Sequence, residues 1–375
     1  MTGDHVGGNR GATRVSRLAG IDTLRGLAAA AVFVCHSAQY WSFLAIPHVL
    51  SRVMSWGAQG VDVFIVISGF CLMMPVVFSH GRLNTGQFYG RRAWRILPAY
   101  WVALAIASVL AVLPATWALV VAAPATFADV LIHVVGMQTW VPSTLGTING
   151  SLWSVSLEIQ LYIVFPLLIL LWRRLGIWWL LVIALALAVV WGLLGGVDAL
   201  SAYVGDPHAL PARLIQFTMG MGCAVWVTRG RPPRARTSAL AAALFGALAA
   251  AALTFHAFGA VQLVLWGACG ASLVMLISVR GQSGHVVTQL EAFGARSYSF
   301  YLLHQPALLL FAPIVALIPG RWIAPLILGG LVCFAVTTLA AMVLFRYVEL
   351  PSHRAGRRRF PNVTPRVSPT EAVES

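Results

Sequence analysis

The stretch IWWLLVIALALAVVWGLLGGV, residues 177–197, contains no charged side chain. A helix rises about 1.5 Å per residue, so this run covers about 30 Å, which is the thickness of the hydrocarbon core of a bilayer. Arg173 and Arg174 stand directly before it. An apolar run of this length beside a basic pair predicts a helix that spans a membrane.

The rest of the chain repeats this pattern. Of its 375 residues, 59% are hydrophobic and 10% are charged, and its mean hydropathy is +0.83. A soluble domain carries about 25% charged residues, so the composition predicts an all-α integral membrane protein, a bundle of about ten transmembrane helices. The expected spans lie near residues 22–44, 59–79, 98–121, 152–172, 177–197, 210–228, 238–256, 260–279, 296–318 and 323–348.

The arginines predict the orientation of these helices. With ten spans and a cytoplasmic N-terminus, the outer segments hold only Arg52, Arg213 and Arg321, and all other arginines lie inside or at the inner mouths of helices. Positive charge collects on the cytoplasmic side of membrane proteins. We therefore expect both termini in the cytoplasm.

Three segments follow from this topology. Residues 1–20 form a cytoplasmic N-terminal segment, and residues 21–350 form the transmembrane domain. Residues 351–375 form a basic cytoplasmic tail that is expected to be disordered at its end, where Pro, Ser, Thr and Val dominate. The first apolar run is long, which favours an uncleaved first helix over a signal peptide.

The net charge of +14 comes from 25 basic residues, all of them arginine. Because these arginines stand between apolar runs, they indicate contact with the lipid bilayer and with anionic substrates, and not with nucleic acid. The five cysteines lie in apolar runs with no paired spacing, so we expect neither a disulfide framework nor a metal site.

Ionisable side chains within spans are costly and often functional. The rise per residue places His36 on the first span and Glu158 on the fourth at about the same depth. A carboxylate beside an imidazole raises its basicity and fixes its tautomer, as a general base requires. The pair is therefore a candidate catalytic couple, with a purely structural link between two helices as the alternative.

Other polar groups in the spans are weaker candidates. Arg25 lies at the inner mouth of the first helix, where a topology anchor is the alternative. Asp62 and Ser68 lie on the second helix, where Ser68 can also serve close packing. Tyr298 and His304 lie on the ninth helix, where His304 can equally be a buried histidine bonded to a neighbour.

The segment Phe88–Pro98 reads as a cytoplasmic loop with two arginines three residues apart. On a helical turn Arg92 and Arg95 share a face and can hold one phosphate group. Tyr89 and Trp94 offer stacking surfaces for a ring. This pattern suits an anionic cofactor that contains a nucleotide, although a basic anchor beside the membrane has the same composition.

Taken together, these motifs resemble the membrane-bound acyltransferase 3 family of O-antigen, Nod-factor and macrolide O-acylating enzymes. The resemblance covers about residues 20–359. Its motifs occur in order as Ile21–Gly26 with ten residues between Arg25 and His36, Gly60–Phe64 leading to Ser68–Phe70, Arg92-x-x-Arg95 with Pro98 and Tyr100, Trp153 to Glu158 and Tyr162, Ser297 to His304, and Glu349–Pro351. At Ile159 the family often has an acidic residue instead.

The resemblance implies a transferase that moves an acyl group from cytosolic acyl-CoA, acetyl-CoA above all, to a hydroxyl of a glycan or a small molecule. It implies that Arg25 and His36 are catalytic and that Arg92 and Arg95 contact the phosphates of CoA, with Ser68 a further candidate contact. It also implies the cytoplasmic membrane of a bacterium as the location. A transporter or flippase, or a sensor without activity, remains an alternative.

Overall fold

The computed structural model describes residues 20–111, 125–197, 204–230, 232–255, 258–279 and 285–361. These residues form helices, turns and loops and no strand, which confirms the predicted all-α class. Residues 1–19, which make up nearly all of the predicted N-terminal segment, lie outside the described residues. So do residues 362–375, the end of the predicted tail.

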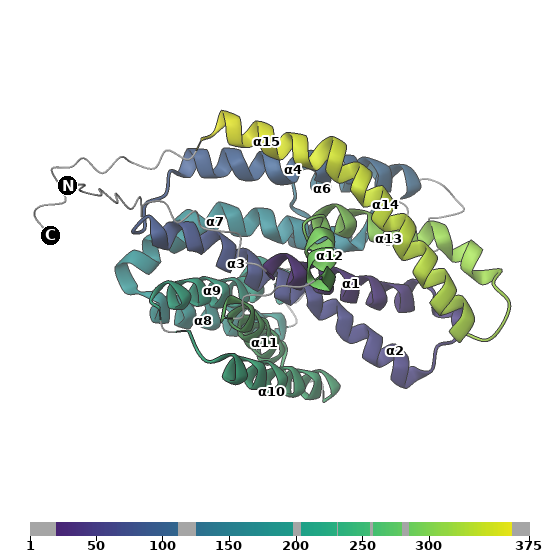
Figure 1. Ribbon diagram of the computed structural model, residues 1–375, viewed down its shortest axis with the longest axis horizontal. Coiled ribbons are helices and arrows are strands. Elements are labelled where there is room, and N and C mark those ends of the chain that lie inside the picture. The colour runs from purple at the N-terminus through teal and green to yellow at the C-terminus, as the bar shows by residue number, and fades with distance from the viewer. Residues whose placement is uncertain are drawn as a thin grey trace, which may run out of the picture.

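Figure 1 shows the arrangement of the helices. The α-helices are α1 (Ile21–Tyr40), α2 (His48–Ser55), α3 (Gly60–Phe78), α4 (Thr85–Ala111), α6 (Phe127–Val134), α7 (Trp153–Leu175), α8 (Ile177–Gly195), α9 (Leu210–Thr228), α10 (Ala235–Thr254), α11 (Gly259–Val279), α12 (His285–Gly294), α13 (Ser297–Ala316), α14 (Gly330–Leu344) and α15 (Leu350–Arg359). Two π-helical segments, Pro325–Gly329 and Phe345–Glu349, precede and follow α14.

Among the described residues, nine helical segments are long and apolar enough to cross a membrane. They match nine of the ten expected spans. The tenth, α9, has the length but carries Arg213 and Gln216 near its start. Both side chains hydrogen-bond to Asp62 near the start of α3. About one helical turn further along both helices, Gly220 of α9 lies against the backbone of Val66 on α3. The two helices are therefore parallel and lie at the same depth.

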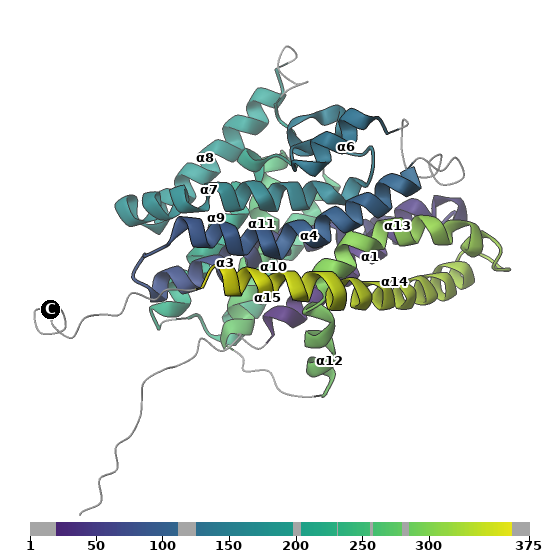
Figure 2. The same cartoon turned by 90° about the horizontal axis from the view of Figure 1, so that it is seen from above.

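Neighbouring helices in the bundle are often distant in sequence. Figure 1 shows α4 and α15 side by side along one edge, with α10 and α11 at the opposite edge. Figure 2 shows α6 and α8 on one side of the bundle and α12 on the other. In the interior α1 packs against α3, α12 and α13, whereas α7 packs against α4, α8 and α9.

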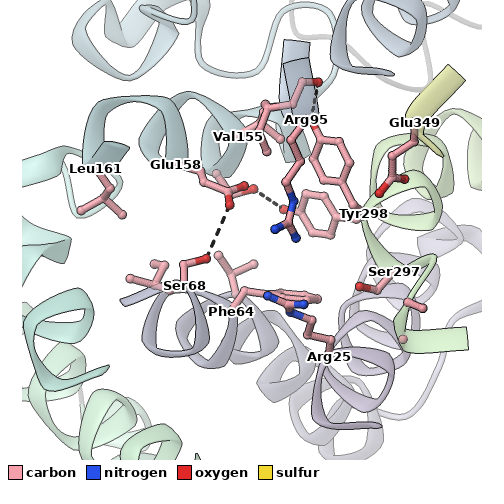
Figure 3. A pocket seen from close by; sticks show the side chains of 17 residues that line it. Arg25, Phe64, Ser68, Arg95, Val155, Glu158, Leu161, Ser297, Tyr298 and Glu349 are labelled. Carbon is pink, nitrogen blue, oxygen red and sulfur yellow. Dashed lines mark hydrogen bonds between the residues drawn. The ribbon is translucent and has the colours of Figure 1, made fainter. Parts of the chain in front are cut away.

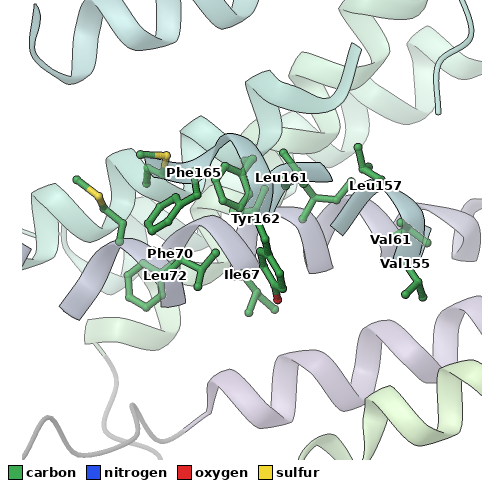
Figure 4. Packing of buried hydrophobic residues seen from close by; sticks show 14 of the residues in the cluster. Val61, Ile67, Phe70, Leu72, Val155, Leu157, Leu161, Tyr162 and Phe165 are labelled. Carbon is green, nitrogen blue, oxygen red and sulfur yellow. The ribbon is translucent and has the colours of Figure 1, made fainter. Parts of the chain in front are cut away.

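A large apolar cluster fills the space between α3 and α7. Figure 4 shows Ile67 and Phe70 of α3 beside Tyr162 and Phe165 of α7, all of them almost fully buried. Close-packed interiors of this kind hold side chains in fixed rotamers. The cluster thus fixes the separation of the two helices that carry Ser68 and Glu158.

Two predicted boundaries differ from the structure. Residues 88–98 are not a loop, because they lie within α4, which runs on through Pro98. Residues 351–359 are helical and continue the last span as α15 without a break from Phe345–Glu349. The apolar run alone could not show this extension, since α15 is basic and is held by packing of Gly356 against Trp94 of α4.

Candidate functional site

A cavity of about 100 Å³ lies inside the bundle, between α1, α3, α4, α7 and α13. Figure 3 shows that Arg25, Ser68, Arg95, Glu158 and Tyr298 point toward it from five different helices. All five were predicted site residues, so the structure brings them together. The polar side chains of its lining are Arg25, Ser68, Arg95, Ser154, Glu158, Ser297, Tyr298, Tyr301 and Glu349.

Glu158 stands on α7 one turn before Tyr162, and the hydroxyl of Tyr162 donates a hydrogen bond to its carboxylate. The hydroxyl of Ser68 reaches the same oxygen across the cavity at 3.5 Å. The guanidinium groups of Arg92 and Arg95 are close enough to the carboxylate to attract it. The carboxyl group of Glu158 is thus held inside the bundle by hydrogen bonds from two hydroxyl groups, with two guanidinium groups nearby.

His36 does not pair with Glu158, and the predicted couple is wrong. In the described part of the chain, the hydrogen bond of His36 is to His304 of α13, with 2.7 Å between its Nδ1 atom and Nε2 of His304. The rise per residue gives the depth of a side chain but not the direction in which it points. Because α1 packs against α13 while α7 packs against α4, α8 and α9, two residues at one depth face different neighbours.

Arg25 lines the cavity from α1. Its Nη1 atom lies 3.1 Å from Oδ1 of Asp22, one turn earlier, and its Nη2 atom lies 3.8 Å from the sulfur of Cys71. Glu349, at the end of the second π-helical segment, lines the same region and accepts a hydrogen bond of 2.5 Å from Ser299. The cavity therefore combines guanidinium groups with carboxylates.

Arg92 and Arg95 share the face of α4 that meets α7, as their spacing predicted. Arg95 lines the cavity, whereas the guanidinium carbon of Arg92 lies 5.5 Å from the ring centre of Tyr162 and 5.8 Å from that of Phe88. The Nε atom of Arg92 is buried, with no hydrogen-bond partner among the described residues. A buried donor that lacks a partner is costly and is suited to receive an anionic ligand.

Asp62 lies outside the cavity, in a buried ionic cluster at the end of the bundle where α3, α7 and α9 begin. It forms an ion pair with Arg213 and accepts a hydrogen bond of 2.8 Å from Gln216. The guanidinium of Arg213 also lies 5.1 Å from the ring centre of Trp153. Asp62 thus links α3 to α9, and its surroundings indicate a packing role.

A second acidic group stands beside this cluster, in the segment before α9. Oδ1 of Asp206 lies 2.8 Å from Nδ1 of His208, and the ring of His208 contacts Trp153. Burial alone would raise the pKa of Asp206, but hydrogen bonds from the side chain and backbone of His208 outweigh it and hold the pKa below its usual range.

Four polar residues that lie in or beside the site were not among the predicted site residues. Tyr301 lines the cavity and hydrogen-bonds to Ser154 at 2.8 Å. Glu349 and Ser154 belong to quoted motifs, and Arg213 interrupts an apolar run, so each carried a signal. For Tyr301 the signal was its position one turn after the candidate Tyr298. The divergent Ile159 contacts Gly136 and does not line the cavity.

The guanidinium groups in this cavity favour a reaction in which a neutral group of a substrate gains negative charge. They can stabilise negative charge that develops on an oxygen atom of a substrate. Space for several waters is present, which also fits the reactive end of a long substrate but not the whole of a large one.

Comparisons with known proteins agree with this picture. The model of a family described as an acyltransferase domain matches residues 18–346. No solved structure matches the chain.

Relatives from three organisms show the extent of the likeness. The acyltransferase MdmB of Streptomyces mycarofaciens is 26% identical over 78% of this chain and 79% of its own length. The exopolysaccharide production protein ExoZ of Rhizobium meliloti is 28% identical over 81% of this chain and 92% of its own. The peptidoglycan O-acetyltransferase OatA of Listeria monocytogenes is 27% identical over 92% of this chain and 57% of its own.

Proposed function

This chain belongs to the acyltransferase family whose model spans residues 18–346, and from that premise we propose that it transfers an acyl group from acyl-CoA to a hydroxyl of a glycan. Acetyl-CoA is the expected donor. Membership in an acyltransferase family makes the chain an enzyme that transfers acyl groups, and a transporter or a sensor without activity has no comparable support.

The observation that carries the proposal is the cavity. Its charged side chains come from predicted motifs on separate helices, with Arg25 from the first motif, Arg95 from the arginine pair and Glu158 from the glutamate motif. In acyl transfer the carbonyl oxygen of the donor becomes negative as the hydroxyl attacks. A guanidinium of Arg25 or Arg95 within reach of that oxygen would stabilise this charge.

The size of the cavity supports a donor that enters by one end. A volume of about 100 Å³ suits the acyl group and the thioester but not the nucleotide. The nucleotide would then lie nearer the start of α4, where Arg92 has a buried Nε atom without a partner in the described residues. In this proposal Arg92 and Arg95 attract the phosphates of CoA, and Ser68 faces the thioester.

His36 is the proposed general base; it does not itself line the cavity, but its partner His304 contacts Tyr301, which does. His36 would remove the proton of the acceptor hydroxyl, a contribution typically worth about 10²–10⁴-fold in rate. The acceptor class rests on relatives whose names refer to peptidoglycan and exopolysaccharide. A secreted small molecule is a second acceptor class to be tested. Because nine helical segments of the described residues are long and apolar enough to span a membrane, the proposed location is the cytoplasmic membrane of a bacterium.

The test uses purified protein in lipid nanodiscs with radiolabelled acetyl-CoA and a panel of oligosaccharide and small-molecule acceptors. Wild type should transfer label to at least one hydroxyl acceptor. His36→Ala should lower the rate by about 10² or more while the protein stays folded. Transfer at the wild-type rate by this variant would remove His36 from the mechanism.

Arg92→Ala tests the donor site separately. It should raise the KM for acetyl-CoA by about tenfold, because a charge-assisted contact to phosphate is worth about 1.5–3 kcal/mol. An unchanged KM would exclude Arg92 from donor binding. Arg82→Ala, an exposed arginine before α4, is the matched control and should leave the KM within about twofold.

A further inference from the structure

His36 and His304 form a pair of imidazoles that holds α1 against α13. Their facing nitrogen atoms are 2.7 Å apart and their rings are nearly parallel, at 12° with 5.0 Å between centres. One turn below, Phe33 of α1 contacts Phe300 of α13. His304 is 1% exposed, so its surroundings leave it one orientation.

The backbone decides which nitrogen atoms carry hydrogen. Nδ1 of His304 lies 2.5 Å from the carbonyl oxygen of Tyr301. A carbonyl oxygen only accepts, so Nδ1 of His304 must be the donor. A neutral imidazole has a single N–H, so Nε2 of His304 is then an acceptor. The contact of 2.7 Å with His36 therefore requires a hydrogen on Nδ1 of His36. Nε2 of His36 is left without a hydrogen.

We infer that His304 is a positioning residue for His36, holding it in the tautomer whose Nε2 atom can take a proton. This inference rests on the proposed function, in which His36 is the general base. It replaces Glu158, which the sequence had suggested for this role. In the described part of the chain, neither imidazole has a hydrogen bond or ion pair with a carboxylate, and the carbonyl of Tyr301 takes that place.

The same pair of imidazoles can carry the proton of the acceptor hydroxyl during acyl transfer. As the acceptor oxygen attacks the thioester carbon, its O–H bond breaks and an N–H bond forms at Nε2 of His36. The positive charge is shared when the hydrogen on Nδ1 of His36 moves toward Nε2 of His304, which keeps its own bond to Tyr301. The C–S bond then breaks, and the leaving thiolate takes a proton from Nε2 of His36.

Two substitutions of His304 separate positioning from packing. His304→Gln keeps an amide oxygen that can accept from Nδ1 of His36. His304→Phe keeps a ring against Phe300 but has no acceptor. We expect His304→Phe to lower kcat by about 10- to 100-fold, the usual effect of losing a group that orients a functional histidine. The KM for acetyl-CoA should stay within about twofold, and His304→Gln should retain at least about a fifth of kcat.

A merely structural role would give a different result. Both variants would then lose folded protein or activity together, and amide substitution would give no rescue. Equal kcat values for His304→Gln and His304→Phe, or a wild-type kcat for His304→Phe, would overturn the inference.

A second measurement does not depend on activity. Diethyl pyrocarbonate reacts with an imidazole nitrogen that lacks hydrogen, and mass spectrometry gives its rate at His36 relative to the exposed His80. Wild type and His304→Gln should react at His36 at similar relative rates. His304→Phe should react more slowly, because Nε2 then carries the hydrogen part of the time, while Nδ1 faces position 304 and is blocked by the introduced ring.

The rate of modification of His36 also distinguishes failure of the proposed function from failure of the inference about His304. If wild type transfers no acyl group to any acceptor, the proposed function fails, while the relative rates still decide the tautomer of His36. If wild type transfers acyl groups but His36 reacts equally fast in all three proteins, the inference about His304 fails and the proposed function stands.

Discussion

At the scale of single residues, Glu158 is the carboxyl group of the cavity with the most polar neighbours. Tyr162 donates to it, and Arg92 and Arg95 lie close to it. We expect Glu158→Gln to lower kcat by about 10²-fold or more, because the neutral amide leaves both guanidinium groups without their counter-charge. Transfer from labelled acetyl-CoA measures this.

The matched control is Glu291→Gln on α12. Its Oε1 atom accepts a hydrogen bond of 2.9 Å from the backbone of Gly20, which glutamine can also accept, and Glu291 does not line the cavity. Activity of this variant should stay within about twofold of wild type. Equal losses for both substitutions would mean that the charge of Glu158 has no special role.

Asp62 gives a prediction about stability. Its pair with Arg213 is buried, with Arg213 only 8% exposed. Asp62→Asn should lower the free energy of unfolding by about 3–5 kcal/mol, because it leaves a buried guanidinium unpaired. The double variant Asp62→Asn/Arg213→Gln should be more stable than the single one. Thermal unfolding in one detergent measures both, and a double variant that loses the sum of both single effects would contradict this account.

The sequence could supply the members of the site but not their partners. His36, Arg25 and Glu158 were found because charged or titratable groups are rare in apolar spans. Which of them meet depends on how each helix is rotated and on its neighbours. His36 of α1 and His304 of α13 are 268 residues apart in the chain. No local pattern contains that information.

At the scale of helices, α3 and α9 are joined by two glycines. A Cβ atom at Gly220 would overlap the carbonyl oxygen of Val66, and one at Gly69 would overlap that of Phe217. Small residues let two membrane helices approach this closely. Gly220→Ala should therefore destabilise the protein by about 1–3 kcal/mol or more, since backbone has to move.

Gly222, two residues further along α9, is the matched control. A Cβ atom there would meet Cγ1 of Ile177 at 3.6 Å, an ordinary contact. Gly222→Ala should be neutral or slightly stabilising, since alanine favours the helix. If thermal unfolding shows the same loss for both alanine variants, close approach of α3 and α9 is not what the glycine at position 220 provides.

Apolar length predicted nearly every long helix, and failed where helices are polar or short. The start of α4 reads as a loop because Arg91, Arg92 and Arg95 interrupt the apolar pattern, yet packing beside α15 and α7 keeps it helical. In the described part of the segment between α4 and α7, residues 125–152, the chain forms α6 and three short 3₁₀ turns, Gln138–Trp140, Pro142–Thr144 and Gly150–Leu152. Tertiary hydrogen bonds, such as the one from Gln138 to the carbonyl of Leu152, hold these turns in place. No periodic pattern of apolar residues in the sequence predicts them.

At the scale of the whole molecule, α9 decides whether the termini share one side of the membrane. Nine crossings would place them on opposite sides and ten on the same side. Because α9 is parallel to α3 and lies at the same depth, a membrane crossed by α3 is also crossed by α9. The contacts of Phe33 with Phe300 and of His36 with His304 show that α1 and α13 are parallel too.

These directions predict which exposed arginines share a face. Arg82 and Arg229 follow the ends of α3 and α9, whereas Arg52 and Arg321 follow α1 and α13. The chain has no lysine. Single Arg→Lys variants therefore offer one side-chain amine to an impermeant reagent without a change of charge. In intact spheroplasts the lysines at 52 and 321 should react, and those at 82 and 229 only after lysis, as the cytoplasmic excess of arginine requires. A lysine at 229 that reacts together with that at 52 would mean that α9 does not cross, whatever its packing against α3.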